Sequence, residues 1–153
     1  MNVAGLQRRL FRTGNALGVW AYRTTNGKVG GRAMGGSPVL LLTVKGRSTG
    51  QPHTVPVSYV EHDGGWLVCG SAGGAPTDPQ WFRNLRALAV TDTAQVRLRS
   101  TTYDVAVRVL DGTDRAEAFA AFVAQAPGFA GYEDRTGGRL LPVALLTPVT
   151  AVT

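Results

Sequence analysis

The chain has 153 residues, of which 44% are hydrophobic and 17% charged, and its formal net charge at pH 7 is +6. This length fits one domain with a substantial core and leaves little room for a second full domain. The single Cys69 excludes an intrachain disulfide, and one cysteine with two histidines makes no convincing zinc cluster, so we expect no metal site. No apolar run approaches the ~20 residues of a transmembrane helix.

Positive charge is concentrated in the first part of the chain. Residues 1–60 carry eight Lys or Arg and no acidic residue, whereas residues 61–153 carry eight basic and ten acidic residues. This asymmetry indicates an anionic partner, which could be a phosphate-bearing cofactor, an anionic lipid or a nucleic acid. No nucleic-acid-binding motif accompanies it, so we expect no nucleic-acid partner. Arginines at positions 8, 9 and 12 interrupt the apolar centre that a signal peptide needs, which favours a cytoplasmic protein.

The first segment is predicted to be a basic amphipathic helix. Between Val3 and Tyr22 the apolar side chains fall within about a third of a turn, and arginines group beside them. Either this helix attaches reversibly to an anionic membrane, or it packs on the rest of the protein. Residues 24–36 are glycine-rich and predict a mobile linker. We therefore divide the chain into residues 1–36 and one domain over residues 37–153.

The second segment has the pattern of short antiparallel strands separated by turns. Pro56 falls inside one of them and requires a bulge or an edge position, because proline donates no ladder hydrogen bond. Residues 62–65 are predicted to form a hairpin turn. The predicted strands are residues 39–44, 54–61, 66–72, 94–100, 103–109 and 140–147.

Two helices are predicted among these strands. Asp78, followed by proline, is a typical N-cap for a helix that runs to about Ala89. Asp114 and Glu117 resemble a capping box that opens a helix over residues 115–126. Short antiparallel strands with two helices indicate an α+β fold built on a closed or split barrel, since closure removes exposed sheet edges.

The turn after the first strand has the composition of an anion site. It is basic and rich in hydroxyl groups, and its glycines permit bends that direct backbone donors outward. A solvated hairpin turn is the competing interpretation of the same composition. The candidate ligand residues are Lys45, Arg47, Ser48, Thr49, Gly50, Gln51, Pro52 and His53.

A glycine-rich corner and a helix follow this turn along the chain. The corner consists of Gly70, Ser71, Ala72, Gly73 and Gly74. Such small residues permit a planar ring to approach closely, although a plain bend in a barrel uses them as well. On the helix, Trp81 is either a ligand contact or a core anchor. A buried Asn84 needs a partner, because an unsatisfied amide costs ~1–3 kcal/mol.

Three pieces recur here in the order Gly-Arg-x-x-Gly-x-Pro, Ser-x-Gly-Gly-Ala-Pro and Pro-x-Trp-x-x-Asn-Leu-Arg-Ala. Together they resemble the deazaflavin-dependent nitroreductase and quinone reductase family. The resemblance covers residues 38–87 well and reaches weakly through residues 127–148. It implies a mainly antiparallel split β-barrel, similar to the FMN-binding split barrels, with flanking helices. Residues 37–153 would then form a barrel that binds the 8-hydroxy-5-deazaflavin coenzyme F-420.

The resemblance also implies roles for individual residues. The turn would bind the phosphate-bearing tail of the coenzyme, although the family often has a basic residue in place of Ser48 and Arg in place of His53. Pro56 and the glycine corner would line the ring, with Ser71 near its reactive edge. The helix would contribute Trp81, Asn84 and Arg86 to cofactor binding.

The family's acceptor pocket is often rich in tyrosine. The matching positions here are Ser58, Ala126, Phe129 and Tyr132, so three of the four lack the phenol. Tyr132 remains a candidate for hydrogen bonding or proton donation, against the alternative of simple loop packing. We expect cofactor binding to resemble the family more closely than the range of acceptors does.

The function that the resemblance implies is hydride transfer from reduced deazaflavin to a quinone-like or nitro-aromatic acceptor. One alternative is an oxidoreductase that binds FMN in the same barrel. Another is a non-catalytic deazaflavin carrier, held at a membrane by the basic N-terminus. Related barrels often pair, so a homodimer is a further expectation.

Overall fold

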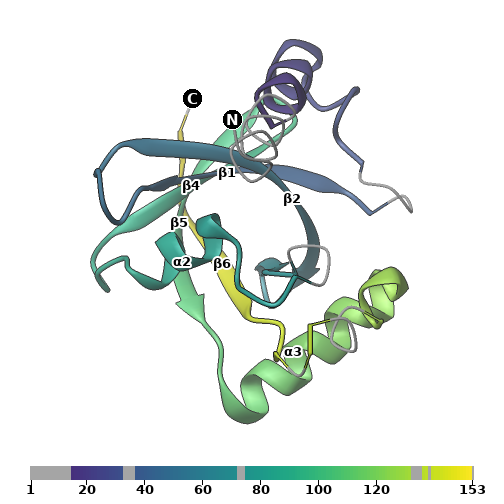
Figure 1. Ribbon diagram of the computed structural model, residues 1–153. Coiled ribbons are helices and arrows are strands. Elements are labelled where there is room, and N and C mark those ends of the chain that lie inside the picture. Colours follow the sequence, from purple (N-terminus) through teal and green to yellow (C-terminus); the bar gives the residue numbers. More distant parts are fainter. Residues whose placement is uncertain (1–14, 33–36, 72–74, 132–135, 138, 153) are drawn as a thin grey trace, which may run out of the picture.

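The computed structural model describes residues 15–32, 37–71, 75–131, 136–137 and 139–152, and for residues 150–152 it describes the backbone. Six strands form a closed barrel in the order β1-β2-β3-β6-β5-β4, and every neighbouring pair is antiparallel (Figure 1). The predicted α+β barrel with flanking helices is therefore confirmed.

Among the described residues, one helical segment precedes the strands, and two helices lie between strands. A helical segment covers residues 15–25, α2 lies between β3 and β4, and α3 lies between β5 and β6. The bounds are β1 Val39–Lys45, β2 Pro52–His62, β3 Gly65–Cys69, α2 Gln80–Arg86, β4 Thr93–Leu98, β5 Thr101–Val109, α3 Gly112–Gln125, the 3-10 turn η2 Pro127–Phe129 and β6 Val143–Val152.

The barrel interior is the main core, and α2 contributes to it. Leu40 and Leu42 alternate along β1 with outward residues and point into this core. Phe82 and Leu85 of α2 belong to the same buried cluster and are 0% and 2% exposed. Each such side chain stabilises the fold by roughly 1.5–3 kcal/mol through burial. The core thus fixes α2 against the barrel.

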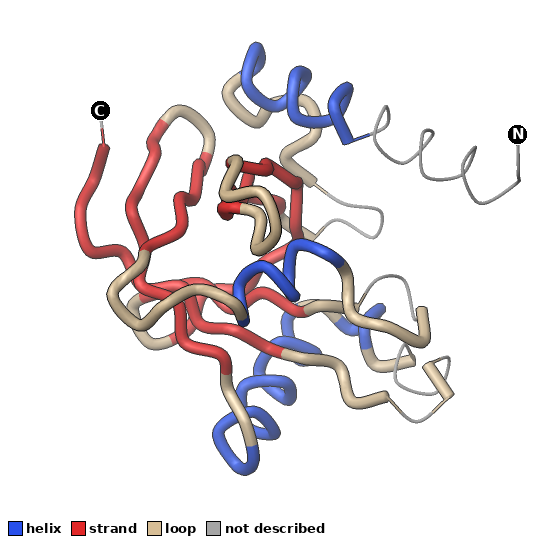
Figure 2. Tube along the Cα trace, turned by 60° about the vertical axis from the view of Figure 1, so that its left-hand side comes forward, coloured by secondary structure: helices blue, strands red, loops and turns tan. Residues whose placement is uncertain are grey.

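The other two helices cover the outside of the barrel. Phe122 of α3 is fully buried in a second cluster with Leu67 and Leu141. Tyr22, in the helical segment, packs with Val39 and the outward residues of β1 in a third cluster. Figures 1 and 2 both place this segment and α3 on opposite sides of the barrel. No helix in the described ranges is long and apolar enough to cross a membrane.

The helical segment is anchored by a buried phenol. The Tyr22 side chain is 1% exposed; its hydroxyl accepts a hydrogen bond from Arg99 N (2.8 Å) and donates one to Arg97 O (3.3 Å). These contacts are those expected of a helix packed on the barrel. Leu17 and Trp20 nevertheless remain 63% and 65% exposed on its other face. The predicted part of this helix before residue 15 lies outside the described residues.

Two predictions about turns and edges are confirmed. Pro56 pairs with Leu41 of β1, whereas β3 pairs with β2 only from Tyr59 onward, so Pro56 occupies a stretch with one partner strand. The β2–β3 turn places Asp63 and Gly64 at φ 49° and 75°. Both values lie in the left-handed region that two-residue hairpins use.

Several predicted element ends are wrong. Pro79, not Asp78, is the N-cap of α2, and the helix ends at Arg86. Helix α3 starts after Asp111 without a side-chain cap bond, and Asp114 instead pairs with an arginine of β5. The last strand is Val143–Val152 rather than residues 140–147. Asp78 and Asp114 both form ion pairs with arginines, and this pairing competes with helix capping.

Candidate cofactor site

The predicted anion turn connects β1 to β2 as a tight hairpin. Gly46 N donates to Gln51 O (2.7 Å), and Gly50 N donates to Gly46 O (2.8 Å). Gly50 has φ 70°, a conformation that glycine adopts without strain. Gln51 N bonds Thr49 Oγ1 (3.2 Å). Because these backbone donors are used inside the turn, a ligand would meet mainly its side chains.

Those side chains are exposed to solvent. Arg47, Ser48, Thr49 and His53 are all exposed. A Cβ added to Gly46 would lie 2.9 Å from both His53 Nε2 and Thr49 Oγ1, so these two side chains crowd over that glycine. The turn therefore presents a guanidinium, hydroxyl groups and an imidazole on one small surface.

The turn is joined to α2 by Arg47. Its backbone N and its Nη1 both donate to Asn84 Oδ1, at 3.2 and 2.7 Å, and its Nη2 donates to Gln80 Oε1 at 2.7 Å. Asn84 is only 7% exposed. This buried amide thus has the partner that we expected it to need, and the partner belongs to the protein itself.

Two other predicted cationic ligands have carboxylate partners. The Lys45 ammonium lies 2.8 Å from Asp92 Oδ2. Arg86 pairs with Asp78, and its guanidinium lies 5.0 Å from the centroid of the Phe82 ring. These contacts reduce the positive charge that either side chain can offer to a ligand, so Arg47 is the main cation of the turn.

The glycine corner lies against the same helix. A Cβ on Gly70 would meet the Phe82 ring at 3.0 Å and Pro142 at 2.8 Å. Gly70 is therefore small because α2 packs against it, which is a different reason from approach by a ligand ring. Ser71 is half-buried. The predicted ring contacts Ala72, Gly73 and Gly74 lie outside the described residues.

Arg139 holds the corner to the start of α2. Its guanidinium donates to Gly70 O (3.1 Å), Ser71 O (3.1 Å) and Ala75 O (2.7 and 3.1 Å), and also to Asp78 Oδ1 (2.6 Å). Its side chain is 14% exposed. The sequence did not identify Arg139 as a site residue. Its only local signal is its position beside the apolar residues before β6, and that position does not show which groups the guanidinium binds.

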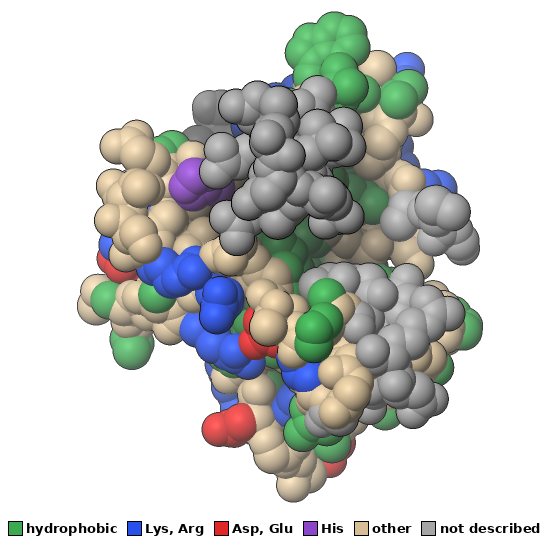
Figure 3. Space-filling view, in the orientation of Figure 1, with side chains coloured by type: hydrophobic (Ala, Val, Ile, Leu, Met, Phe, Trp, Pro, Cys, Tyr) green, Lys and Arg blue, Asp and Glu red, His purple; other side chains and the backbone are tan. Residues whose placement is uncertain are grey.

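Trp81 borders the site from α2. It is half-buried, and its ring lies edge-on to Phe82 with centroids 5.4 Å apart. It also packs against the barrel core. In the orientation that shows α2 in front, the surface is hollowed near its centre, with hydrophobic side chains in the hollow and Lys and Arg along one side (Figure 3). The turn and Gly70 therefore each contact α2, the turn through Arg47 and Gly70 through Phe82.

Three of the four predicted acceptor residues, Ser58, Ala126 and Phe129, lie on β2 or just after α3. Ala126 lines a cavity of about 210 Å³ together with Tyr59 and Glu61. Phe129 stacks edge-on with Phe122, with centroids 4.7 Å apart. Ser58 is half-buried on β2, next to Tyr59. Tyr132 lies outside the described residues.

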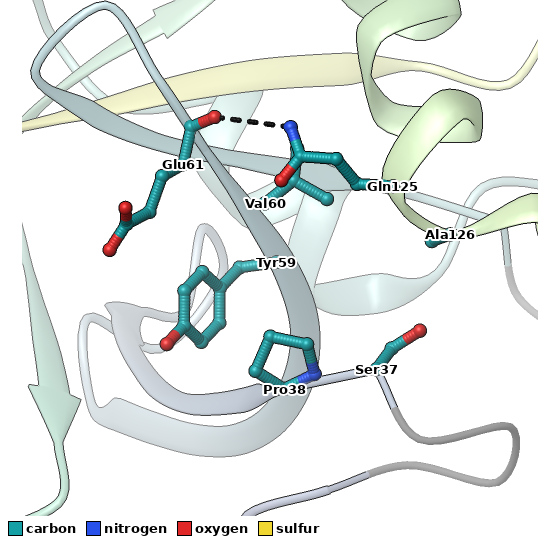
Figure 4. Close-up of a pocket in the computed structure, with 7 residues that line it drawn as sticks. All are labelled: Ser37, Pro38, Tyr59, Val60, Glu61, Gln125 and Ala126. Atoms are coloured by element: carbon teal, nitrogen blue, oxygen red, sulfur yellow. Dashed lines mark hydrogen bonds between the residues drawn. The ribbon is translucent and has the colours of Figure 1, made fainter.

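Tyr59 is a second residue that sequence reasoning missed. Burial raises the pKa of its phenol, and the nearby Tyr22 and Glu61 raise it further. The hydroxyl therefore stays protonated at neutral pH. In Figure 4 its ring lies beside Pro38 and turns away from Ala126. From the sequence alone, an aromatic residue in a predicted strand that lines a cavity looks the same as one that packs in the core.

Comparison with known proteins identifies the family of this chain. A family model described as F420H(2)-dependent quinone reductase matches residues 16–148. An F420H(2)-dependent quinone reductase of Mycobacterium tuberculosis and a putative one of Mycobacterium bovis are each 42% identical over 66 residues. That segment spans 43% of this chain and 44% of each relative, so the match covers less than half of the relatives' length.

Solved structures show the same fold. An F420-H2-dependent reductase superposes with a TM-score of 0.62 at 31% identity, over 71% of this chain and 93% of that one. A protein described as a domain-swapped dimer superposes with a TM-score of 0.65 at 26% identity, over 95% and 99% of the two chains. Because the family model covers most of the sequence, the chain belongs to the F420H(2)-dependent quinone reductase family.

Proposed function

We propose that this protein is an oxidoreductase that uses reduced coenzyme F-420 to reduce a quinone. The observation that carries the proposal is the bonding of Arg47, in the anion turn, to Asn84 and Gln80 of α2. It brings a cationic surface beside the tryptophan helix and the glycine corner, as a ligand with a charged tail and a flat ring requires. Nitro-aromatic compounds are the second acceptor class in the proposal.

The residues present fit such a coenzyme. Exposed Arg47, Ser48, Thr49 and His53 would hold the anionic tail through charge and hydrogen bonds, with Gln51 beside them. The Ser71 carbonyl already accepts from Arg139, so Ser71 offers its hydroxyl and amide to the ring. Arg139 acts as a positioning residue that keeps the corner in shape.

The coenzyme supplies a hydride when bound, and the quinone takes up that hydride and one proton to become a hydroquinone. The chain's own part is to orient the acceptor and to exclude water. Pro56 would line the ring, and Ser58, Ala126 and Phe129 would border the acceptor. We propose Tyr132 as the hydrogen-bonding group for its oxygen, which Tyr132→Phe tests by a change in kcat rather than in coenzyme affinity.

The direct test is turnover with purified protein. Reduced coenzyme F-420 is mixed with menadione, and its oxidation is followed by the recovery of deazaflavin absorbance. The proposal expects oxidation that depends on protein and saturates with menadione. Coenzyme binding without turnover across quinones and nitro compounds would instead identify a carrier. Copurified flavin, with no binding of the deazaflavin, would identify the FMN alternative.

We also propose a peripheral contact with anionic membrane through the helical segment. Exposed Leu17 and Trp20 lie on the face of this segment that the barrel leaves uncovered, and Arg23 is exposed nearby. Flotation with anionic vesicles should recover the wild type and lose the Leu17→Ser/Trp20→Ser variant. Equal flotation of both proteins would reject the contact.

A homodimer is a further proposal, supported by the similar structure described as a domain-swapped dimer. Light scattering across a concentration series tests it directly. A mass of one chain at every concentration would reject it.

A further inference from the structure

A second cavity, of about 530 Å³, lies beside Tyr59 and away from the anion turn. It reaches Val39 at the start of β1, whereas the turn follows Lys45 at the end of the same strand. Six residue steps at about 3.3 Å separate these positions by roughly 20 Å. The second cavity is therefore a different site from the proposed binding surface of the coenzyme tail. We call it the basic cavity, because Lys28, Arg32 and Arg99 line it.

Its lining has the two halves of an amphipathic site. Tyr22, Tyr59 and Leu98 supply aromatic and apolar walls, and Lys28, Arg32 and Arg99 supply cationic groups. The volume falls within the range of ~300–1,000 Å³ that small-molecule pockets occupy. Apolar walls with a few charged groups favour a ligand with a flat apolar body and an anionic end.

The positive charge of the basic cavity is not balanced within its lining. None of the described residues that border it is acidic, and neither Lys28 nor Arg99 forms an ion pair with any of the described residues. Glu61, whose charge helps to raise the pKa of Tyr59, lines the neighbouring cavity of about 210 Å³. Like charges gathered around one cavity create a positive potential that an anion relieves.

The β4–β5 hairpin fixes the position of Arg99 beside the basic cavity. Arg99 and Ser100 alone lie between the paired residues Leu98 and Thr101, and Arg99 has φ 54°, in the left-handed region that two-residue hairpins use. The bond from Arg99 N to the buried Tyr22 hydroxyl holds the backbone there. Arg99 thus lines the cavity from a turn with a fixed backbone.

Tyr59 supplies a hydrogen-bond donor to the same space. Its hydroxyl makes no hydrogen bond to any residue in the described part of the chain, and Figure 4 shows the ring beside Pro38, another wall of the basic cavity. A neutral phenol donates readily to a carboxylate. We propose that the basic cavity binds a small amphipathic anion, of which an aromatic carboxylate is the simplest form, independently of the coenzyme.

Calorimetric titration with 2-naphthoate and neutral 2-naphthamide tests this proposal. The carboxylate should bind saturably and at least about tenfold more tightly than the amide, because charged hydrogen bonds are the stronger ones. Lys28→Gln/Arg99→Gln should weaken naphthoate about tenfold, and Tyr59→Phe about threefold. Arg108→Gln, which removes an exposed cation outside the cavity, should bind like the wild type.

The site assignment has its own control. Saturating coenzyme F-420 should leave the naphthoate affinity within about twofold, since the two sites are separate. Competition with the coenzyme would place naphthoate elsewhere and overturn the proposal. Equal affinities for naphthoate and naphthamide, or an unchanged affinity in the double variant, would overturn it as well. Thermal unfolding of every variant confirms that folded proteins are compared.

Discussion

Removal of Arg139 should loosen the corner that faces the proposed ring site. Arg139→Ala removes five hydrogen bonds, to three carbonyl oxygens and to Asp78. A hydrogen bond to a charged group contributes about 1.5–3 kcal/mol. The loss should be smaller than the sum, because water can reach the gap and Asp78 keeps its pair with Arg86. We therefore expect a destabilisation of about 3 kcal/mol.

Urea unfolding measures this loss, and coenzyme fluorescence at a temperature where the variant is folded measures the effect on the site. Arg139→Lys keeps the charge near Asp78 but loses the planar fork, so it should fall between the wild type and Arg139→Ala. The control is Arg108→Gln, whose pair with Asp114 is exposed and should contribute less than about 0.5 kcal/mol. If Arg139→Ala behaves like this control in both assays, the positioning role is refuted.

Three other changes probe the fold and its charges. Phe122→Ala removes a ring from the cluster between α3 and the barrel and should lower the free energy of unfolding in urea by about 3–5 kcal/mol. A loss below about 1 kcal/mol would show that this cluster is not packed as described. Tyr22→Phe removes the hydroxyl that receives Arg99 N and should cost about 1–2 kcal/mol, with faster amide exchange at Arg99 as the specific readout. The hydrogen bond from Lys45 and that from Ala89 N lower the pKa of Asp92 below its ordinary value of 3.8. The associated stability is present above that value and is lost as pH falls through the lowered pKa, and Lys45→Gln should raise the pKa in a carboxyl NMR titration.

The strand pattern was predictable because alternation and turn residues are local signals. The His62–Gly65 turn and the position of Pro56 follow from backbone constraints that the sequence states directly. The ends of the helices were not predictable in the same way. Asp78 is a typical N-cap, yet Arg86 at the end of α2 and the distant Arg139 bind its carboxylate in the fold.

The site shows the same division between local and distant causes. The turn and α2 were predicted as separate motifs, and their composition indicated an anion site. The Arg47 guanidinium donates to Asn84 because the hairpin packs against the helix in the fold. Residue spacing in the sequence does not reveal this packing. Gly70 was predicted to let a ligand ring approach closely. In the fold, the Phe82 ring packs against Gly70 and leaves no room for a side chain there. The importance of Arg139 likewise arises from contacts across more than 60 positions of the chain.

The central claim is that the turn after β1 holds the anionic tail of the coenzyme, and binding affinity tests it most directly. Arg47 and Ser48 are both exposed there, so charge can be removed at one and added at the other. Fluorescence titration with coenzyme F-420 should show binding about tenfold weaker for Arg47→Gln and about threefold tighter for Ser48→Lys, with both differences shrinking at high salt. Equal dissociation constants for the wild type and both variants would contradict the account.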